Sequence, residues 1–296
     1  LSPAKVKQLR QAVLAACDAM DGLADGIVSR YEACIGAFDP RQLRCADGSD
    51  AGDTCLSQAQ VAAVETLHRP YDFGFAVANG VTAYPGWTYG SEDQPEGMIA
   101  WVTGAAPAEF PVRTPQTQGR QWYYGNGGIR YVIAGDAHFD PPTFTPGAFA
   151  ERIRQISALM DATDPDLTAF LARGGKLILK ENGADFAQSP FAGIDYCKSV
   201  VARMGEAQVE RFLRFYVTPG ASHSGAGVSG TDGSPLPQGV DLFGALDEWV
   251  SDGTAPETLM QTAQAPAAPF PLVAARPLCR YPLYPRYRGG GDPQEA

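Results

Sequence analysis

The chain has 296 residues, of which 45% are apolar and 19% charged, proportions that suit one large or two smaller globular domains. Its net charge of −10 at pH 7 argues against nucleic acid or an anionic membrane surface as a partner, since both require a basic face. No apolar run approaches the roughly 20 residues of a membrane span. The chain begins Leu-Ser-Pro without a signal-peptide pattern, so we expect it to be processed or to be part of a longer polypeptide.

A helix is predicted at the amino terminus, over residues 1–17, where Ser2 can cap it and apolar residues recur every three or four positions. A second helix is predicted over residues 57–68, because Ser57 and Gln60 form a capping-box pattern. The stretch between these two helices is rich in turn-forming residues.

Four of the six cysteines lie within the first 55 residues, at Cys17, Cys34, Cys45 and Cys55. Their neighbours are not the His residues and Cys-x-x-Cys pairs of a zinc site. We therefore predict Cys17–Cys34 and Cys45–Cys55 disulfides and an oxidising location, secreted or periplasmic, with scattered reduced thiols as the alternative. Cys197 falls on the apolar stripe of a predicted helix, so we expect a buried free thiol there.

The apolar residues in the middle of the chain follow neither the helical nor the strand period. Residues 71–146 are rich in glycine, proline and aromatic residues, a composition typical of irregular regions that carry binding surfaces. A helix is predicted after this region, over residues 147–160.

Beyond Asp166 the pattern alternates between strand and helix. Strands are predicted over residues 174–180 and 211–220, and helices over residues 189–205 and 241–253. This order is typical of a parallel sheet covered by helices, so the predicted fold class is α/β. The tail from residue 286 is expected to be flexible.

Two candidate catalytic residues follow the two predicted strands. Asp185 comes after the first, and His223, one of only three histidines, comes after the second in the stretch GASHSGAG. An acid followed by a histidine at the carboxyl ends of parallel strands is the order of α/β-hydrolases, in which the carboxylate orients a histidine that acts as general base. We predict that Asp185 and His223 are hydrogen-bonded, with a loop histidine of no function as the alternative.

Several segments together resemble the tannase and feruloyl esterase family. They are ACDAMDGLADGIVSRYEAC, YPGWTYGSE, DATDPDLTAFLARGGKLILKENGAD, FYVTPGASHSGAG, WVSDGTAPE and ARPLCRYP. The resemblance implies an α/β-hydrolase core with a large irregular lid domain. Residues 1–165 would be the lid with a calcium loop, and residues 166–296 the C-terminal part of the core.

The resemblance also implies a function: a serine carboxylic ester hydrolase acting on esters of aromatic acids, of feruloyl, galloyl or terephthaloyl type. No G-x-S-x-G motif precedes Asp185. The expected partner is therefore an N-terminal polypeptide segment that carries the nucleophilic serine, and the expected ligand is a small aromatic ester. A noncatalytic calcium-binding fragment or binding module that retains the fold is the alternative.

The sequence departs from the family pattern at three places. In the family, a cysteine directly after the histidine forms a disulfide with a cysteine next to the nucleophilic serine. Ser224 stands at that position here, so the disulfide cannot form and we expect packing alone to hold the acid–base geometry. Glu181-Asn182 stands where a His-Gly pair is common, and the usual partner of Cys279 is missing.

The family resemblance implies a structural Ca²⁺ site near the first disulfide. Asp18, Asp21 and Asp25 place three carboxylates within eight residues, which would repel one another without a cation. The family pattern adds the carbonyl groups of Leu23 and Ile27. An ordinary turn rich in Asp and Gly is the alternative.

An aromatic acid requires a flat apolar slot and a polar group to hold it. The segment QWYYGNGGIR offers Trp122, Tyr123, Tyr124 and Arg130, which are the predicted substrate-binding residues. The alternative is that these aromatic rings form the core of the lid and that Arg130 faces solvent.

Overall fold

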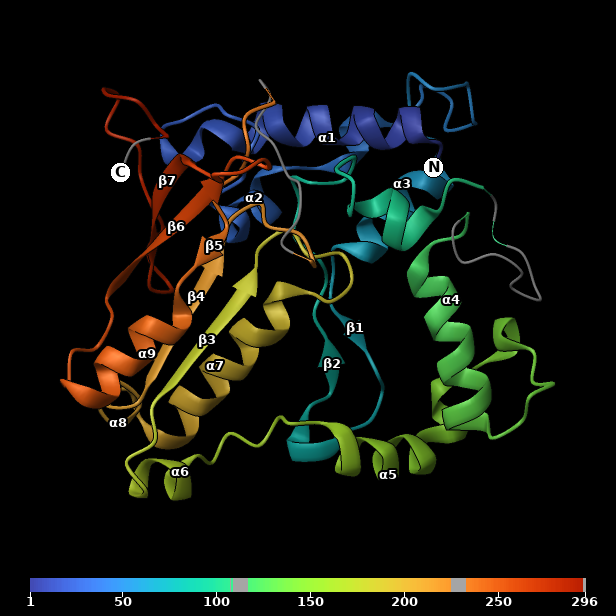
Figure 1. Cartoon of the computed structure of the whole chain (residues 1–296). Coiled ribbons are helices and arrows are strands. Elements are labelled where there is room, and N and C mark those ends of the chain that lie inside the picture. The colour runs from blue at the N-terminus through green and yellow to red at the C-terminus, as the bar shows by residue number, and fades with distance from the viewer. Residues whose placement is uncertain (107, 109–116, 225–232, 295–296) are drawn as a thin grey trace.

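The computed structural model of the chain describes residues 1–106, 108, 117–224 and 233–294. Within these residues, helices surround a parallel pair of strands, an antiparallel three-stranded sheet and a short antiparallel ribbon (Figure 1). The strands are β1 (Tyr71–Asp72), β2 (Ala83–Tyr84), β3 (Leu177–Asn182), β4 (Leu213–Thr218), β5 (Gly239–Val240), β6 (Thr258–Gln264) and β7 (Leu272–Cys279). The α-helices are α1 (Pro3–Cys17), α2 (Tyr31–Ala37), α3 (Gln58–Leu67), α4 (Arg120–Gly127), α5 (Ala150–Met160), α6 (Thr168–Ala172), α7 (Pro190–Met204), α8 (Glu206–Val209) and α9 (Leu242–Ser251).

The helices predicted from the sequence are confirmed as α1, α3, α5, α7 and α9. Ser2 caps α1 by accepting a hydrogen bond from a first-turn N–H, and Asp241 does the same for α9. Ser57 and Gln60 form both bonds of the predicted capping box. These side chains satisfy N–H groups that a helix leaves without partners, so they determine where each helix begins.

Both predicted disulfides, Cys17–Cys34 and Cys45–Cys55, are present. Each closes a short loop and restricts the unfolded chain, which stabilises the fold by about 3 kcal/mol per bridge. The remaining cysteines, Cys197 and Cys279, are free thiols that are only half-buried. Burial raises the pKa of both thiols, so both are protonated at neutral pH.

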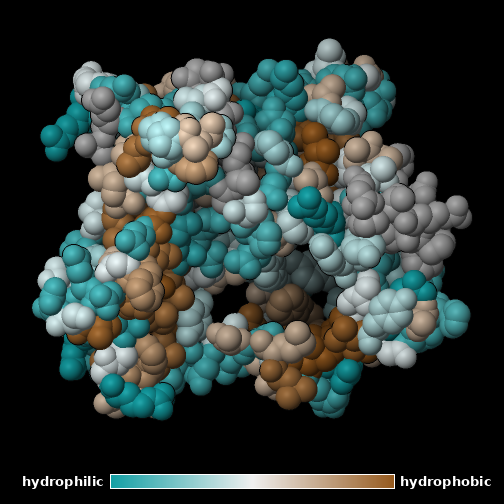
Figure 2. Space-filling view, viewed as in Figure 1, coloured by the Kyte–Doolittle hydropathy of each residue, from teal (hydrophilic) through white to brown (hydrophobic). Residues whose placement is uncertain are grey.

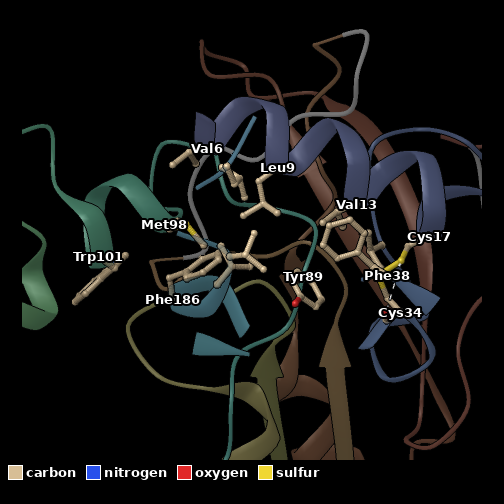
Figure 3. Close-up of a cluster of buried hydrophobic side chains, with 14 residues drawn as sticks. Val6, Leu9, Val13, Cys17, Cys34, Phe38, Tyr89, Met98, Trp101 and Phe186 are labelled. Carbon is tan, nitrogen blue, oxygen red and sulfur yellow. Dashed lines mark hydrogen bonds between the residues drawn. A yellow bond between two sulfur atoms is a disulfide. The ribbon is translucent and has the colours of Figure 1, made fainter. Parts of the chain in front are cut away.

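The main hydrophobic core lies against one face of α1 (Figure 3). Val6, Leu9 and Val13 are fully buried there, and each contributes about 1.5–3 kcal/mol by leaving water. Other members of the cluster come from distant parts of the chain, namely Phe38, Tyr89, Met98, Trp101 and Phe186. Phe186 follows β3, so this core contains residues from both sides of the predicted boundary at position 165. The division of the chain into a lid and a hydrolase core stays a prediction.

The strands β3 and β4 pair in parallel, as predicted, with Leu177 opposite Leu213 and Asn182 opposite Thr218. The connection between them contains α7, whose buried Ile194 packs against β4. The two strands therefore end at the same edge of the sheet, toward α1 and α2 in Figure 1.

The strand β4 is shielded from solvent, because all 6 of its residues are buried. Helices α7 and α8 cover it with Val200 and Val209, while Leu259 and Leu278 of the β6–β7 hairpin pack on Tyr216. In contrast, the 6 residues of β3 are half-buried, and β4 is its only strand partner among the described residues.

The antiparallel sheet of β5, β6 and β7 is not predicted from the sequence. It adjoins β4 through a bridge between Tyr216 and Arg280. The tail beyond it, expected to be flexible, is held in place over its described residues. The Ala275 N–H donates to the Gln294 carbonyl at 2.8 Å, and the Tyr287 N–H donates to the Asp21 carbonyl at 2.9 Å.

Residues 71–146, which show no regular hydrophobic period, contain the β1–β2 ribbon and α4. A π-helix, η5 (Gly128–Ala134), continues directly from α4. In the space-filling view, openings lie on both sides of the ribbon (Figure 2). No described helix has the length and apolar character needed to cross a membrane.

Candidate active site

The parallel strands bring an acid and a histidine together. Asp185 follows β3, His223 follows β4, and the Nδ1 atom of His223 lies 2.9 Å from the Oδ2 atom of Asp185. Both loops lie at the same edge because the strands are parallel and end in register. The hydrogen bond expected from the sequence is therefore present, while the catalytic role of the pair stays a prediction.

The environment of the pair is asymmetric. Only 5% of the Asp185 side chain is exposed, against 48% of the His223 side chain. The Oδ1 atom of Asp185 accepts the N–H groups of Ala187 and Gln188 at 2.7 and 3.2 Å, which leaves Oδ2 for the histidine. When Nδ1–H donates to this carboxylate, the neutral ring presents Nε2 as an acceptor, which is the tautomer of a general base.

The segment YPGWTYGSE packs directly against the acid-bearing loop. Thr88 Oγ1 donates to the Gly183 carbonyl at 2.6 Å, and Ser91 Oγ donates to the Ala184 carbonyl at 3.3 Å. These two carbonyls immediately precede Asp185, so the segment fixes the backbone from which the acid projects.

The same segment holds the far end of that loop. Ser189, which caps α7, donates its hydroxyl to the Gly86 carbonyl at 2.6 Å and its N–H to the Tyr84 hydroxyl at 2.8 Å. A Cβ at position 86 would lie 2.4 Å from the carbonyl carbon of His68. Only glycine allows the chain to pass this close.

The histidine-bearing loop is tied to the end of β3. The side-chain amide of Asn182 donates to the Ser222 carbonyl at 2.7 Å, so the Glu181-Asn182 departure from the family pattern places a cross-link beside the site. Gly220 turns the chain after β4 with a φ of 69°, in the left-handed region that favours glycine. Gly225 and Gly227, on the other side of the histidine, lie outside the described residues.

The expectation that packing alone holds the acid–base geometry is wrong. The hydroxyl groups of Ser222 and Ser224, which flank His223, both donate to Oε2 of Glu96, at 3.0 and 2.7 Å. The sequence shows no spacing that links Glu96 to this loop.

Two further residues near the histidine were not singled out from the sequence. The ring of Trp101 meets the ring of His223 edge-on, with centroids 5.2 Å apart and an interplanar angle of 73°. The guanidinium of Arg120 lies 4.9 Å from the centroid of the Trp101 ring. Both residues belong to the region without a clean period, where no pattern points to individual side chains.

Three of the four predicted substrate-binding residues surround one hollow. Tyr123, Tyr124 and Arg130 line a cavity of about 450 Å³ on α4 and η5, whereas Trp122 is not among its lining residues. The Tyr124 ring lies 6.4 Å from the Trp101 ring, so aromatic side chains continue from this helix toward the histidine. Substrate binding by these four residues stays a prediction.

The loop predicted to bind calcium contains two buried carboxylates, Asp18 and Asp21, which are 8% and 7% exposed. Burial raises the pKa of both groups, although backbone N–H groups and, for Asp21, the Ser29 hydroxyl oppose the shift. No ion pair within the described residues involves either carboxylate. An oxygen-only donor set of this kind suits Ca²⁺.

The third carboxylate of that loop is turned toward a cation of the protein. The Oδ2 atom of Asp25 accepts a hydrogen bond from Arg276 at 2.6 Å. Within the part of the chain that the structure describes, no three His, Cys, Asp or Glu side chains converge closely enough to hold a metal. The oxygen atoms of these residues are therefore of the kind that binds calcium, but the three carboxylates do not converge on one point in this structure.

The other two histidines differ from His223. His138 is exposed, and His68 is buried, with its ring stacked on Tyr89 at 3.6 Å and its Nδ1–H donating to the Trp87 carbonyl. Burial lowers the pKa of His68 to about 4, so it is neutral in the folded protein.

The fold and this pair describe an α/β protein with an acid and a histidine at the carboxyl edge of parallel strands. A sequence model of the family "Tannase and feruloyl esterase" matches residues 1–296, and the chain belongs to this family. Similar proteins include a mono(2-hydroxyethyl) terephthalate hydrolase of Piscinibacter sakaiensis, 31% identical over 98% of this chain and 50% of its own length. A probable feruloyl esterase of Arthroderma benhamiae is 32% identical over 95% of this chain and 49% of its own length.

An uncharacterized esterase of Agrobacterium fabrum is 30% identical over 99% of this chain and 51% of its own length. The chain thus spans about half the length of the curated relatives it matches. Among solved structures, an esterase from Aspergillus oryzae superposes with a TM-score of 0.77 at 23% identity, covering 100% of this chain and 56% of that one. Feruloyl esterase B from Aspergillus oryzae superposes with a TM-score of 0.75 at 23% identity, covering 99% of this chain and 56% of that one. The chain shares the fold of the matched part of these esterases.

Proposed function

We propose that this chain is part of a serine carboxylic ester hydrolase that acts on esters of aromatic acids, of feruloyl, galloyl or terephthaloyl type. The observation that carries the proposal is the 2.9 Å contact between His223 and Asp185 at the shared carboxyl edge of β3 and β4. The names of the relatives, which include feruloyl esterases and a terephthalate monoester hydrolase, support both the reaction and the class of acid.

In this reaction His223 Nε2 takes the proton of the serine hydroxyl as that oxygen attacks the ester carbonyl, and then delivers it to the departing alcohol. Asp185 holds the ring in the tautomer that accepts at Nε2 and stabilises the imidazolium that forms. The burial of Asp185 and the 48% exposure of the His223 side chain suit these roles, because the acid is sheltered while the base can reach a substrate.

The nucleophilic serine lies, in this proposal, on an N-terminal polypeptide segment. Two observations support it: the chain matches only 49% to 51% of its relatives' lengths, and the outer edge of β3 has no strand partner among the described residues. A strand from that segment would pair with this edge, which otherwise presents N–H and C=O groups to solvent.

The acid part of the substrate would lie near Trp101 and the aromatic residues of α4. A flat ring packs well against Tyr123 and Tyr124, and Arg130 can pair with a carboxylate such as the free acid of a terephthalate monoester. The 5.2 Å contact of Trp101 with the His223 ring supports a path from this surface to the base.

A structural Ca²⁺ ion at Asp18, Asp21 and Asp25, with the carbonyl groups of Leu23 and Ile27, belongs to the same proposal. The two buried carboxylates support it, since a cation would neutralise charge that burial makes costly. The two disulfides support an oxidising location, secreted or periplasmic.

The test is co-expression of this chain with a serine-bearing N-terminal segment. Methyl ferulate, methyl gallate and a terephthalate monoester would be assayed for hydrolysis. We expect activity on at least one ester, its loss in His223→Ala, and its retention in His138→Ala, which removes an exposed histidine. A folded complex that binds these esters but hydrolyses none would contradict the proposal and favour a noncatalytic binding module.

A further inference from the structure

A single carboxylate oxygen, Oε2 of Glu96, bonds the chain on both sides of His223. It accepts the Ser222 hydroxyl at 3.0 Å, the Ser224 N–H at 2.9 Å and the Ser224 hydroxyl at 2.7 Å. Glu96 is 126 and 128 residues away from these partners in sequence, so these bonds exist only in the folded chain.

This carboxylate is held as an ion in a sheltered place. Its side chain is 20% exposed, and Ser222 is fully buried beside it. Burial alone would raise the pKa of Glu96, but the bonds from Ser224 and Ser222 and the charge of Arg120 outweigh it and lower the pKa. Hydrogen bonds to a charged acceptor are about twice as strong as neutral ones, so three such bonds restrain the loop effectively.

Glu96 also approaches the histidine ring by a second route. Its Oε1 atom lies 3.7 Å from Arg120 Nη1, and the Arg120 guanidinium lies over the Trp101 ring. The Trp101 ring in turn meets the His223 ring edge-on. The Glu96 carboxylate therefore contacts both the loop that carries His223 and Arg120, the cation that packs on Trp101.

We infer that Glu96 is a positioning residue that holds His223 toward Asp185 through hydrogen bonds to Ser222 and Ser224. The inference rests on the proposed function, because the position of this ring affects turnover only if His223 is the base. The need for such a residue follows from the geometry: about half of the His223 side chain is in solvent, so packing restrains only part of it. A displacement of about 1 Å at a catalytic group can cost about 100-fold in rate.

The test uses the complete enzyme, including its serine-bearing segment. Glu96→Ala removes all three bonds and is expected to lower kcat by about 10- to 100-fold with KM changed less than about threefold. Glu96→Gln keeps an oxygen acceptor of the same reach and is expected to stay within about fivefold of the wild type. Glu151→Ala, which removes a carboxylate 77% exposed on α5, is the matched control.

Two further measurements separate positioning from general stability. The His223 Nδ1–H proton, observed by NMR with labelled histidine, should be visible in the wild type and Glu96→Gln and lost to exchange in Glu96→Ala. Adding Glu96→Ala to a Ser222→Ala/Ser224→Ala variant should lower kcat by a smaller factor than Glu96→Ala lowers it in the wild type, because both hydroxyl bonds are already gone and only the bond from the Ser224 N–H remains to be lost.

An unchanged Nδ1–H signal in Glu96→Ala, or equal losses of kcat in Glu96→Gln and Glu96→Ala, would overturn the inference. If the wild-type enzyme hydrolyses no ester, the proposed function fails. The NMR comparison still decides whether Glu96 holds the ring.

Discussion

Arg276 in β7 donates a hydrogen bond to Asp25 in the loop after α1, with Nη1 2.6 Å from Oδ2, although 251 residues separate them. Both side chains are largely buried, with 13% and 16% of their surfaces exposed. The pair ties the loop that carries the buried Asp18 and Asp21 to the C-terminal hairpin. A calcium ion in that loop would share Asp25 with Arg276, so metal binding and this ion pair should be coupled.

Removal of calcium should therefore lower stability. We expect EDTA to reduce the Tm by several degrees and added Ca²⁺ to restore it, because the ion neutralises two buried carboxylates. Protons compete with Ca²⁺ for these carboxylates, and burial raises the pKa of both Asp18 and Asp21, so the Ca²⁺-dependent rise in Tm should shrink as pH falls.

Substitutions provide the control for this calcium prediction. Asp18→Asn and Asp21→Asn should abolish the response of the Tm to Ca²⁺, whereas Asp47→Asn, in an exposed turn, should leave it intact. A Tm that responds to neither EDTA nor Ca²⁺ in the wild type would show that the loop is an ordinary turn.

The acid of the candidate pair should be as important as its base. In the complete enzyme, Asp185→Asn should lower kcat by about 10⁴-fold, because an amide can no longer hold the His223 tautomer that accepts at Nε2. Steady-state kinetics on a methyl hydroxycinnamate ester measures this effect. Asp164→Asn, which alters a carboxylate before α6, is the comparison, and a loss below tenfold in Asp185→Asn would argue against its role.

His68 should make the fold sensitive to mild acid. The folded pKa is about 4 and the unfolded value 6.5, so the unfolded state binds more protons as pH falls through this window, and stability is lost. The full effect is on the order of 3 kcal/mol. Tm should therefore fall more steeply between pH 7 and 4.5 in the wild type than in His68→Gln.

The same scan needs two controls. His138→Gln, at an exposed position, should keep the wild-type slope. Glu92, whose burial raises its pKa to about 7, changes stability in the opposite direction over this range, but it is common to all three proteins and cancels in the comparison. Parallel slopes for the wild type and His68→Gln would refute the prediction.

Gly86 should not tolerate even one added methyl group. A Cβ there would lie 2.4 Å from the His68 carbonyl carbon and 2.5 Å from the next backbone nitrogen, and backbone cannot move aside as a side chain can. Gly86→Ala should destabilise by about 1–3 kcal/mol or more, measured by urea denaturation. Gly36→Ala, with no atom within 4 Å of its Cβ, should be neutral or stabilise by up to about 1 kcal/mol. Equal effects of the two substitutions would contradict this reading of the packing.

Much of the local structure could be predicted from the sequence because its causes are local. Ser2, Ser57 and Asp241 cap helices through groups within three residues, and both disulfides close short loops. The order of Asp185 and His223 after two apolar strands predicts their meeting, since parallel strands end at one edge. The family likewise follows from motif order along the whole chain.

Only the tertiary structure decided what surrounds the pair. Glu96 meets Ser224 across 128 residues, and Trp101 reaches His223 from a region with no period, so no spacing in the sequence records either contact. The burial of β4 depends on the β6–β7 hairpin, in which only some residues are buried and one of these is the polar Gln261, so its apolar pattern is too weak to predict. Local capping and periodicity act within a few residues, whereas the position of a side chain in a site depends on how distant segments pack.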